Sequence, residues 1–348
     1  MAYIGHTGKK ECRRNHTFPL LVLMMLASSV LGVCALAPMG AEERISIRRG
    51  MYLFGIGLVF FTSLFNFINH VAFRTHPGIK FRKKYRLSAF DIMDISNKVV
   101  SSVQAALSCL AGLVVCTYSC TRSFLHTSHY ASEAYAWFGA SYFFYDIWSM
   151  YRVHTCQTGQ VQLNGDVRGN MRSGISNFGH YVKTQPIIIM HHLFIGSFGF
   201  LVIVYLRGGL GDCVFGYVYL MELSTPFVSL RGVLSRLGLK ATRMYVLNGL
   251  LMVATFFFCR VMMFPYVCYL HSQVIGLPYL EAIMTLPRGC KIGILILLLP
   301  QVYWFWLMLK GAAKVFCTSK PPQPQPIGPR KHRKSIYHHH QHQQNHNS

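Results

Sequence analysis

Residues 51–73 read MYLFGIGLVFFTSLFNFINHVAF, a stretch without a single Asp, Glu, Lys or Arg. Its length is enough for one α-helix to cross a bilayer. Similar apolar stretches recur at Phe18–Ala37, Lys98–Cys120, Glu133–Tyr151, Pro186–Leu206, Asp212–Leu230, Tyr245–Leu270 and Cys290–Leu309. None shows the short alternating strands of a transmembrane barrel. The sequence therefore predicts an all-α, polytopic membrane helix bundle, with a seven-span core and one N-terminal helix that resembles a signal anchor.

The composition excludes an ordinary soluble protein. Hydrophobic residues make up 52% of the 348 residues and charged residues only 13%, whereas about 25% of a soluble domain is charged. A soluble fold of this size cannot cover its surface with so few charges, which excludes a soluble enzyme, a disordered protein and a coiled coil. The 11 cysteines form no Cys-x-x-Cys pair. Their scatter argues against a disulfide framework or a structural zinc site.

The distribution of Lys and Arg predicts the orientation in the membrane. The net charge of +23 comes from 34 Lys and Arg against 11 Asp and Glu. Connections rich in Lys and Arg alternate with connections that hold little beyond Arg122, Arg207 or Arg288. We expect the rich connections and the C-terminus to be cytosolic, so the basic charge requires no nucleic-acid partner.

The two ends of the chain lie outside the predicted core. Basic residues precede the first apolar run, and Ala35-Leu36-Ala37 resembles a signal-peptidase site. The run is long for a signal peptide, however, and Pro38 disfavours cleavage. We expect residues 1–50 to be an extension with a retained signal anchor and an unglycosylated Asn15; a cleaved leader is the alternative. Residues 317–348, rich in Pro, basic residues and His, predict a disordered cytosolic tail.

Five ionisable side chains fall inside the predicted spans: Asp146, His191, His192, Glu222 and Arg260. Such a group costs several kcal/mol in a bilayer unless it is paired or faces water, so each is a functional candidate. With a rise of about 1.5 Å per residue, the acid and both histidines lie roughly 8–9 Å inside the same face of the membrane. We therefore expect the carboxylate to meet one imidazole and raise its basicity. A polar cluster that only locks helix packing is the alternative.

A second pair, Glu222 and Arg260, is predicted to form a structural ion pair. Near it, Ser224-Thr225-Pro226 removes a backbone donor and is expected to interrupt the helix, with a lipid-accessible cavity beside Glu222. Glu222, Ser224 and Tyr145 are candidate substrate-binding residues, although packing is the favoured role for the tyrosine. Trp304 and Trp306 fit the aromatic belt at the membrane interface.

Several motifs come in an order that resembles the TLC domain, which translocation-associated membrane proteins and the yeast longevity-assurance proteins share. They are Tyr142-Phe143-Phe144-Tyr145-Asp146, Met190-His191-His192 and Glu222-Leu223-Ser224-Thr225-Pro226-Phe227. Val99–Gln104, Cys259-Arg260-Val261 with Phe264-Pro265-Tyr266, and Pro300–Phe305 resemble the TLC domain-containing protein 3 subgroup. The resemblance covers residues 51–316, which we take as the domain.

The resemblance implies ceramide metabolism in the endoplasmic reticulum membrane, with the Golgi as a second location. Ceramide synthases of the wider family join a fatty acyl-CoA to the amine of a sphingoid base, and their adjacent histidines are catalytic. By that resemblance His191 and His192 act as base or nucleophile and Asp146 orients the imidazole. Fatty acyl-CoA is then a co-substrate, with no metal or other cofactor, and membrane lipids are partners in either a monomer or an oligomer.

One departure from the family keeps a second function open. Ceramide synthases follow the histidine pair with a motif that ends in paired aspartates, whereas this chain has Glu222 and the Ser-Thr-Pro sequence there. A non-enzymatic lipid-binding regulator of membrane lipid composition is therefore the alternative, and a transporter is a distant third. No internal repeat supports an inverted-repeat transporter.

Overall fold

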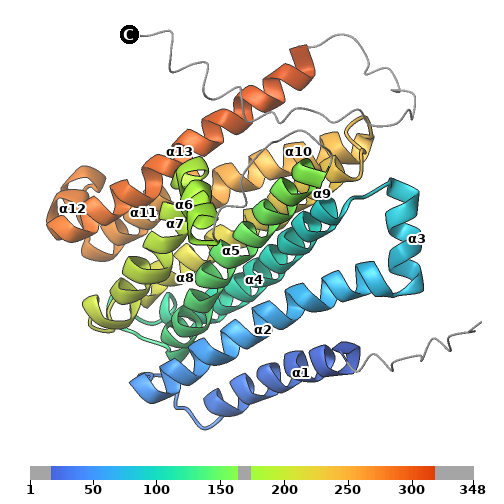
Figure 1. Ribbon diagram of the computed structural model, residues 1–348. Coiled ribbons are helices and arrows are strands. Elements are labelled where there is room, and N and C mark those ends of the chain that lie inside the picture. Colours follow the sequence, from blue (N-terminus) through green and yellow to red (C-terminus); the bar gives the residue numbers. More distant parts are fainter. Residues whose placement is uncertain (1–16, 164–173, 318–348) are drawn as a thin grey trace, which may run out of the picture.

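The computed structural model describes residues 17–163 and 174–317, and every regular element in these ranges is helical (Figure 1). The elements are α1 (Thr17–Leu36), α2 (Ile47–Arg74), α3 (His76–Tyr85), α4 (Ala89–Ser119), α5 (Tyr130–Leu163), α6 (Gly174–Thr184), α7 (Pro186–Phe194), η1 (Ile195–Gly199), η2 (Val202–Leu206), α8 (Asp212–Leu220), η3 (Met221–Ser224), α9 (Thr225–Arg236), α10 (Arg243–Phe256), η4 (Phe257–Val261), α11 (Met263–Ile275), α12 (Tyr279–Thr285) and α13 (Arg288–Cys317). The all-α prediction is confirmed.

Seven of the described helical segments are long and apolar enough to cross a membrane: Thr17–Leu36, Ile47–Arg74, Ala89–Ser119, Pro186–Leu206, Asp212–Arg236, Arg243–Ile275 and Arg288–Ala313. The chain is therefore a multi-pass membrane protein. The eighth predicted span, Glu133–Tyr151, lies in α5, which is long enough but is not among the seven. Its acids and serines are buried in the bundle, where Glu133 is 4% exposed and Asp146 is 3% exposed. These polar side chains make the helix less apolar than its neighbours.

The predictions for the two ends of the chain fall mostly on residues that the structure does not describe. Asn15 lies outside the described ranges, and so does the predicted tail after Cys317. The described part of the N-terminal extension includes α1, which packs along α2 (Figure 1). Most of the side chains of α1 are exposed, as expected for a helix at the lipid boundary.

The centre of the bundle is formed by α4, which packs against α2, α5, α8 and α9. Small residues bring these helices together, as is usual between membrane helices. A Cβ added at Gly112 of α4 would lie 2.8 Å from the carbonyl oxygen of Gly216 in α8. A Cβ added at Gly57 of α2 would overlap the hydroxyl of Ser141 in α5. This close packing fixes α4 and α5, the two helices on which one side of the candidate site is built.

Local sequence explains where the helices begin and where they break. The helix α4 begins with a capping box, in which the Ser88 hydroxyl accepts the Asp91 N–H at 3.1 Å and the Asp91 carboxylate accepts the Ser88 N–H at 3.0 Å. The predicted interruption at Ser224-Thr225-Pro226 is confirmed, because the 3₁₀ turn η3 ends at Ser224 and Pro226 lies in the first turn of α9. The π-helical turn η4 carries Arg260. Irregular turns therefore lie close to the candidate site.

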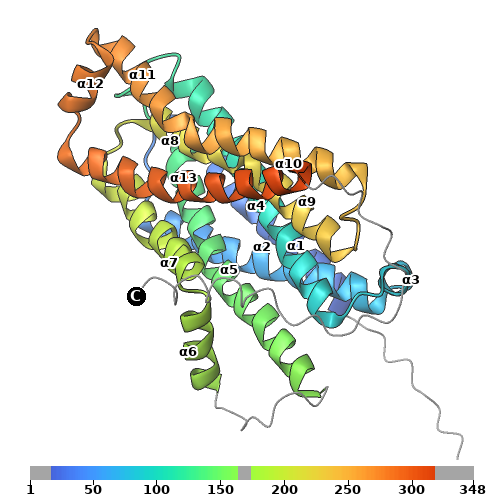
Figure 2. The same cartoon turned by 90° about the horizontal axis from the view of Figure 1, so that it is seen from above.

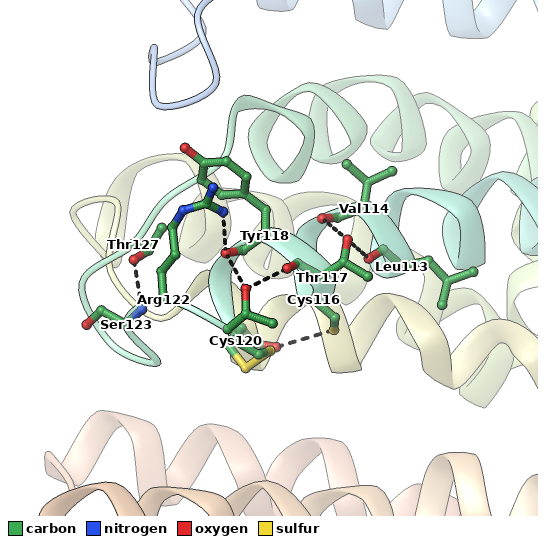
Figure 3. Close-up of a disulfide and its surroundings, with 11 residues drawn as sticks. Leu113, Val114, Cys116, Thr117, Tyr118, Cys120, Arg122, Ser123 and Thr127 are labelled. Atoms are coloured by element: carbon green, nitrogen blue, oxygen red, sulfur yellow. Dashed lines mark hydrogen bonds between the residues drawn. A yellow bond between two sulfur atoms is a disulfide. The ribbon is translucent and has the colours of Figure 1, made fainter.

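A disulfide joins Cys120, at the end of α4, to Cys213 in α8, with a Cα–Cα distance of 4.9 Å (Figure 3). The prediction from cysteine scatter was therefore wrong for this pair. The two cysteines are 93 residues apart in the sequence, and only the packing of α4 on α8 brings them together. A rule based on sequence spacing detects only cysteines that are close together in the chain, so it cannot predict this contact.

Candidate functional site

The first half of the candidate site is a contact between α5 and α7. Nδ1 of His192 lies 3.0 Å from Oδ2 of Asp146, and the two side chains are 13% and 5% exposed. This is an ion-pair distance, although the ring N–H does not point at the carboxylate closely enough for a hydrogen bond. The helical rise predicted that the acid meets one imidazole, and the structure identifies this imidazole as His192.

The helix α4 contributes to the surroundings of the Asp146 carboxylate through a contact with Ser149 of α5. The buried hydroxyl of Ser149 lies 3.4 Å from Oδ1 of Asp146 and donates to Oδ1 of Asn97, in α4, at 2.6 Å. Sequence reasoning missed Asn97 and Ser149, because they are uncharged and belong to no motif. Tyr145 also points toward this region: its hydroxyl lies 3.5 Å from Oδ1 of Asn97 and its ring packs on Phe61. The structure thus places Tyr145 in the core between α2, α4 and α5, and its role in substrate binding stays a prediction.

The other histidine faces a different set of partners. The ring of His191 meets Trp304 of α13 edge-on, with ring centroids 5.1 Å apart and an interplanar angle of 88°. The same helix, α13, supplies Gln301 to the guanidinium of Arg260. Trp304 was expected in the interfacial aromatic belt, but it is half-buried against His191. Adjacent residues point about 100° apart on a helix, so the two imidazoles connect the two halves of the site.

The second half of the site is centred on the guanidinium of Arg260. Its Nη2 lies 3.1 Å from Oε2 of Glu222, which confirms the predicted ion pair. Nε donates to the Ser224 hydroxyl at 2.8 Å and Nη2 to the Thr225 hydroxyl at 2.8 Å, while Nη1 donates to Oε1 of Gln301 at 3.4 Å. Thr225 in turn donates to Oε2 of Glu222 at 2.6 Å. The predicted candidates Glu222 and Ser224 are therefore brought together on one guanidinium.

Thr225 and Gln301 were not predicted as site residues. Gln301 is 3% exposed and lies three residues before Trp304, on the same face of α13. A buried polar residue three positions before a tryptophan is the sequence signal that indicates an inward-facing side of this helix.

Two cavities lie along α10, and Glu222 lines neither of them. A lipid-accessible cavity beside Glu222 therefore stays a prediction.

The arrangement has the groups that proton transfer and anion stabilisation require. An imidazole beside a carboxylate is suited to accept a proton and hold it as an imidazolium. A guanidinium with N–H donors directed into a buried site is suited to stabilise an oxygen on which negative charge develops. His191 lies between these two functions. Within residues 17–163 and 174–317, no three His, Cys, Asp or Glu side chains come together as metal ligands.

The sequence matches the family described as the TLC domain over residues 94–310, which is more than half of the chain. A human relative, TLC domain-containing protein 4, is 27% identical over 148 residues. These residues make up 39% of this chain and 56% of that protein, so the similarity spans about half the length of the relative. The family match includes Asp146, both histidines, Glu222 and Arg260.

Proposed function

This chain belongs to the TLC domain family, and on that premise we propose that it is a membrane N-acyltransferase that joins a fatty acyl-CoA to a sphingoid base to form ceramide. The observation that carries the proposal is the buried contact between His192 and Asp146, with His191 packed on Trp304 of α13, the helix that also supplies Gln301 to Arg260. A lipid-binding protein without catalysis has no need for a proton acceptor in that setting. Assignment to the TLC domain-containing protein 3 subgroup is part of the proposal and is supported by the motifs alone.

The proposed reaction needs a proton acceptor because the sphingoid base arrives as an ammonium ion. His192 takes one proton from it, and the Asp146 carboxylate stabilises the imidazolium. The free amine attacks the thioester carbonyl, the new C–N bond forms, and Arg260 stabilises the developing oxyanion. The C–S bond then breaks. The second proton of the nitrogen goes to the departing thiolate, while the first leaves His192 for water.

We also propose a location in the endoplasmic reticulum membrane, or in the Golgi, with a cytosolic C-terminus. Two independent features support this orientation. The connections poor in Lys and Arg, which are expected in the lumen, follow α4 and precede α8. The disulfide between Cys120 and Cys213 lies at these same ends, and disulfides persist in oxidising compartments.

The direct test is acyl transfer from labelled acyl-CoA to sphinganine by the purified full chain in detergent. We expect His192→Asn to lower the rate about 10²- to 10⁴-fold, the range for removal of a general base. His126→Asn is the matched control, because His126 is exposed in the loop between α4 and α5. Both variants are compared by gel filtration, so that loss of folding is not counted as loss of catalysis. Full activity in folded His192→Asn would refute the proposed role.

The alternative is a non-enzymatic lipid-binding regulator of membrane lipid composition, and one observation favours it. The acid that stands where ceramide synthases carry paired aspartates is Glu222, which is already held by Arg260 and Thr225. It is therefore not free to act as a second base. Wild-type protein that binds sphinganine but transfers no acyl group, under conditions in which a ceramide synthase is active, would favour the regulator.

A further inference from the structure

A small cavity of about 20 Å³ lies between α9, α10 and α13, which run side by side (Figures 1 and 2). It is at the end of the bundle opposite the disulfide, because Cys213 begins the span that ends at Arg236. The guanidinium of Arg231 lines this cavity and sits 4.4 Å from the ring centroid of Tyr245. The remaining walls are mostly apolar and include Met252 of α10 and Met308 of α13.

Arg231 differs in its charge balance from two basic residues at the same end of the bundle, Lys98 and Arg236. Nζ of Lys98 lies 2.8 Å from Asp94, and Nε of Arg236 donates to the same carboxylate at 2.6 Å. Arg231 contacts an aromatic face instead. Across residues 17–163 and 174–317 no carboxylate pairs with Arg231 or with Arg243. Two arginines near this end therefore keep a positive charge that nothing in the described chain neutralises.

The cavity adjoins a shallow, open groove of about 330 Å³ along the start of α10. The groove is lined by Thr242, Arg243 and Leu247, and it shares Val246 and Leu250 with the Arg231 cavity. Leu247 is 60% exposed and Leu250 is 46% exposed, as expected where a membrane helix faces lipid. The first-turn N–H groups of α10 add positive potential at the same end. The groove is thus positively charged at the end of the span, and the rest of its wall is apolar and faces lipid.

We propose that this groove binds a phospholipid, with its phosphate on Arg231 and Arg243 and the start of an acyl chain along Val246 and Leu250. The planar guanidinium binds phosphate oxygens in a bidentate manner, which explains the choice of arginine. The opening toward lipid indicates that the ligand comes from the bilayer. This site is separate from the histidine site, and it holds whether or not the chain is an acyltransferase.

The test uses the purified full chain in detergent and two photoactivatable probes with the same diazirine-bearing acyl chains, phosphatidic acid and diacylglycerol. Only the first carries a phosphate. We expect phosphatidic acid to label peptides from residues 243–253 and 308–312 and diacylglycerol to label them at least about tenfold less, because loss of even one charge-assisted contact has that effect. Equal labelling by the two probes would overturn the proposal.

Variants separate a phosphate site from general attraction to basic helices. Arg231→Gln removes the charge but keeps most of the side-chain length, and we expect it to lower labelling by phosphatidic acid several-fold. The double variant with Arg243→Gln should lower the labelling to the diacylglycerol level. Lys83→Gln makes the same charge change on α3, where Lys83 is exposed, and should leave the labelling of α10 unchanged. Undiminished labelling in Arg231→Gln overturns the proposal. Loss of labelling in excess coenzyme A also overturns it, because the phosphate would then belong to an acyl-CoA.

Discussion

The ion pair between Glu222 and Arg260 allows a quantitative test of the candidate site. In Arg260→Met the carboxylate of Glu222 loses its cation, and the hydroxyls of Ser224 and Thr225 and the amide of Gln301 each lose a donor. Breaking one partner of a buried pair costs about 3–5 kcal/mol. The side chains of Arg260 and Glu222 are 12% and 26% exposed, so we expect the lower end, about 3 kcal/mol.

A double-mutant cycle separates this pair from general damage to packing. Glu222→Gln in the Arg260→Met background removes the uncompensated charge, so the double variant should be more stable than the sum of the single effects by about 1–3 kcal/mol. The free energy of unfolding is measured by titration with SDS, followed by circular dichroism of the purified protein. Arg48→Met, at an exposed position in the first turn of α2, is the control and should change stability by less than about 0.5 kcal/mol. A coupling energy below about 0.5 kcal/mol would show that the pair does not act as a unit.

Three further predictions concern packing, the disulfide and pH. Reduction of the bond between Cys120 and Cys213, which closes 93 residues, should lower stability by at most roughly 4.6 kcal/mol, and less if helices stay in the bilayer; a reductant-insensitive melting temperature would contradict this. Gly57→Leu should cost at least about 1–3 kcal/mol because its side chain overlaps Ser141, whereas Gly55→Leu, with open space at its Cβ, should melt like the wild type. Burial lowers the pKa of His129 below 6.5, so the folded state binds fewer protons than the unfolded state, and stability is lost as the pH falls through the folded pKa. The melting temperature between pH 8 and 5 should therefore depend less on pH in His129→Asn than in the wild type. Identical pH profiles of the melting temperature in the two proteins would exclude the effect.

The contact between Asp146 and the histidine pair was predictable because the helical rise fixes depth. Counting residues from the same end of two neighbouring spans put the acid and the imidazoles level. Which imidazole meets the acid was not predictable, because this depends on the rotation of α7 about its own axis. The structure resolves this in favour of His192 and turns His191 toward Trp304.

The neutral members of the site could not be found by the same reasoning. The cost of burying charge identifies Glu222 and Arg260, but it says nothing about Gln301 or Asn97, whose burial is ordinary once they are hydrogen-bonded. The lower hydropathy of α5 is explained by its buried polar side chains, which contact protein and not lipid. A helix at the centre of a membrane bundle need not be as apolar as its neighbours, because protein surrounds it in place of lipid.

The bond between Cys120 and Cys213 encloses α5, α6 and α7, the segment that holds Asp146, His191 and His192. During synthesis the ribosome must therefore deliver the whole histidine segment before this covalent ring is closed. Formation of this disulfide therefore reports on a late step of folding. Chains with a free Cys213 thiol are those in which α8 has not yet packed against α4. Trapping nascent chains with an alkylating reagent would order these events.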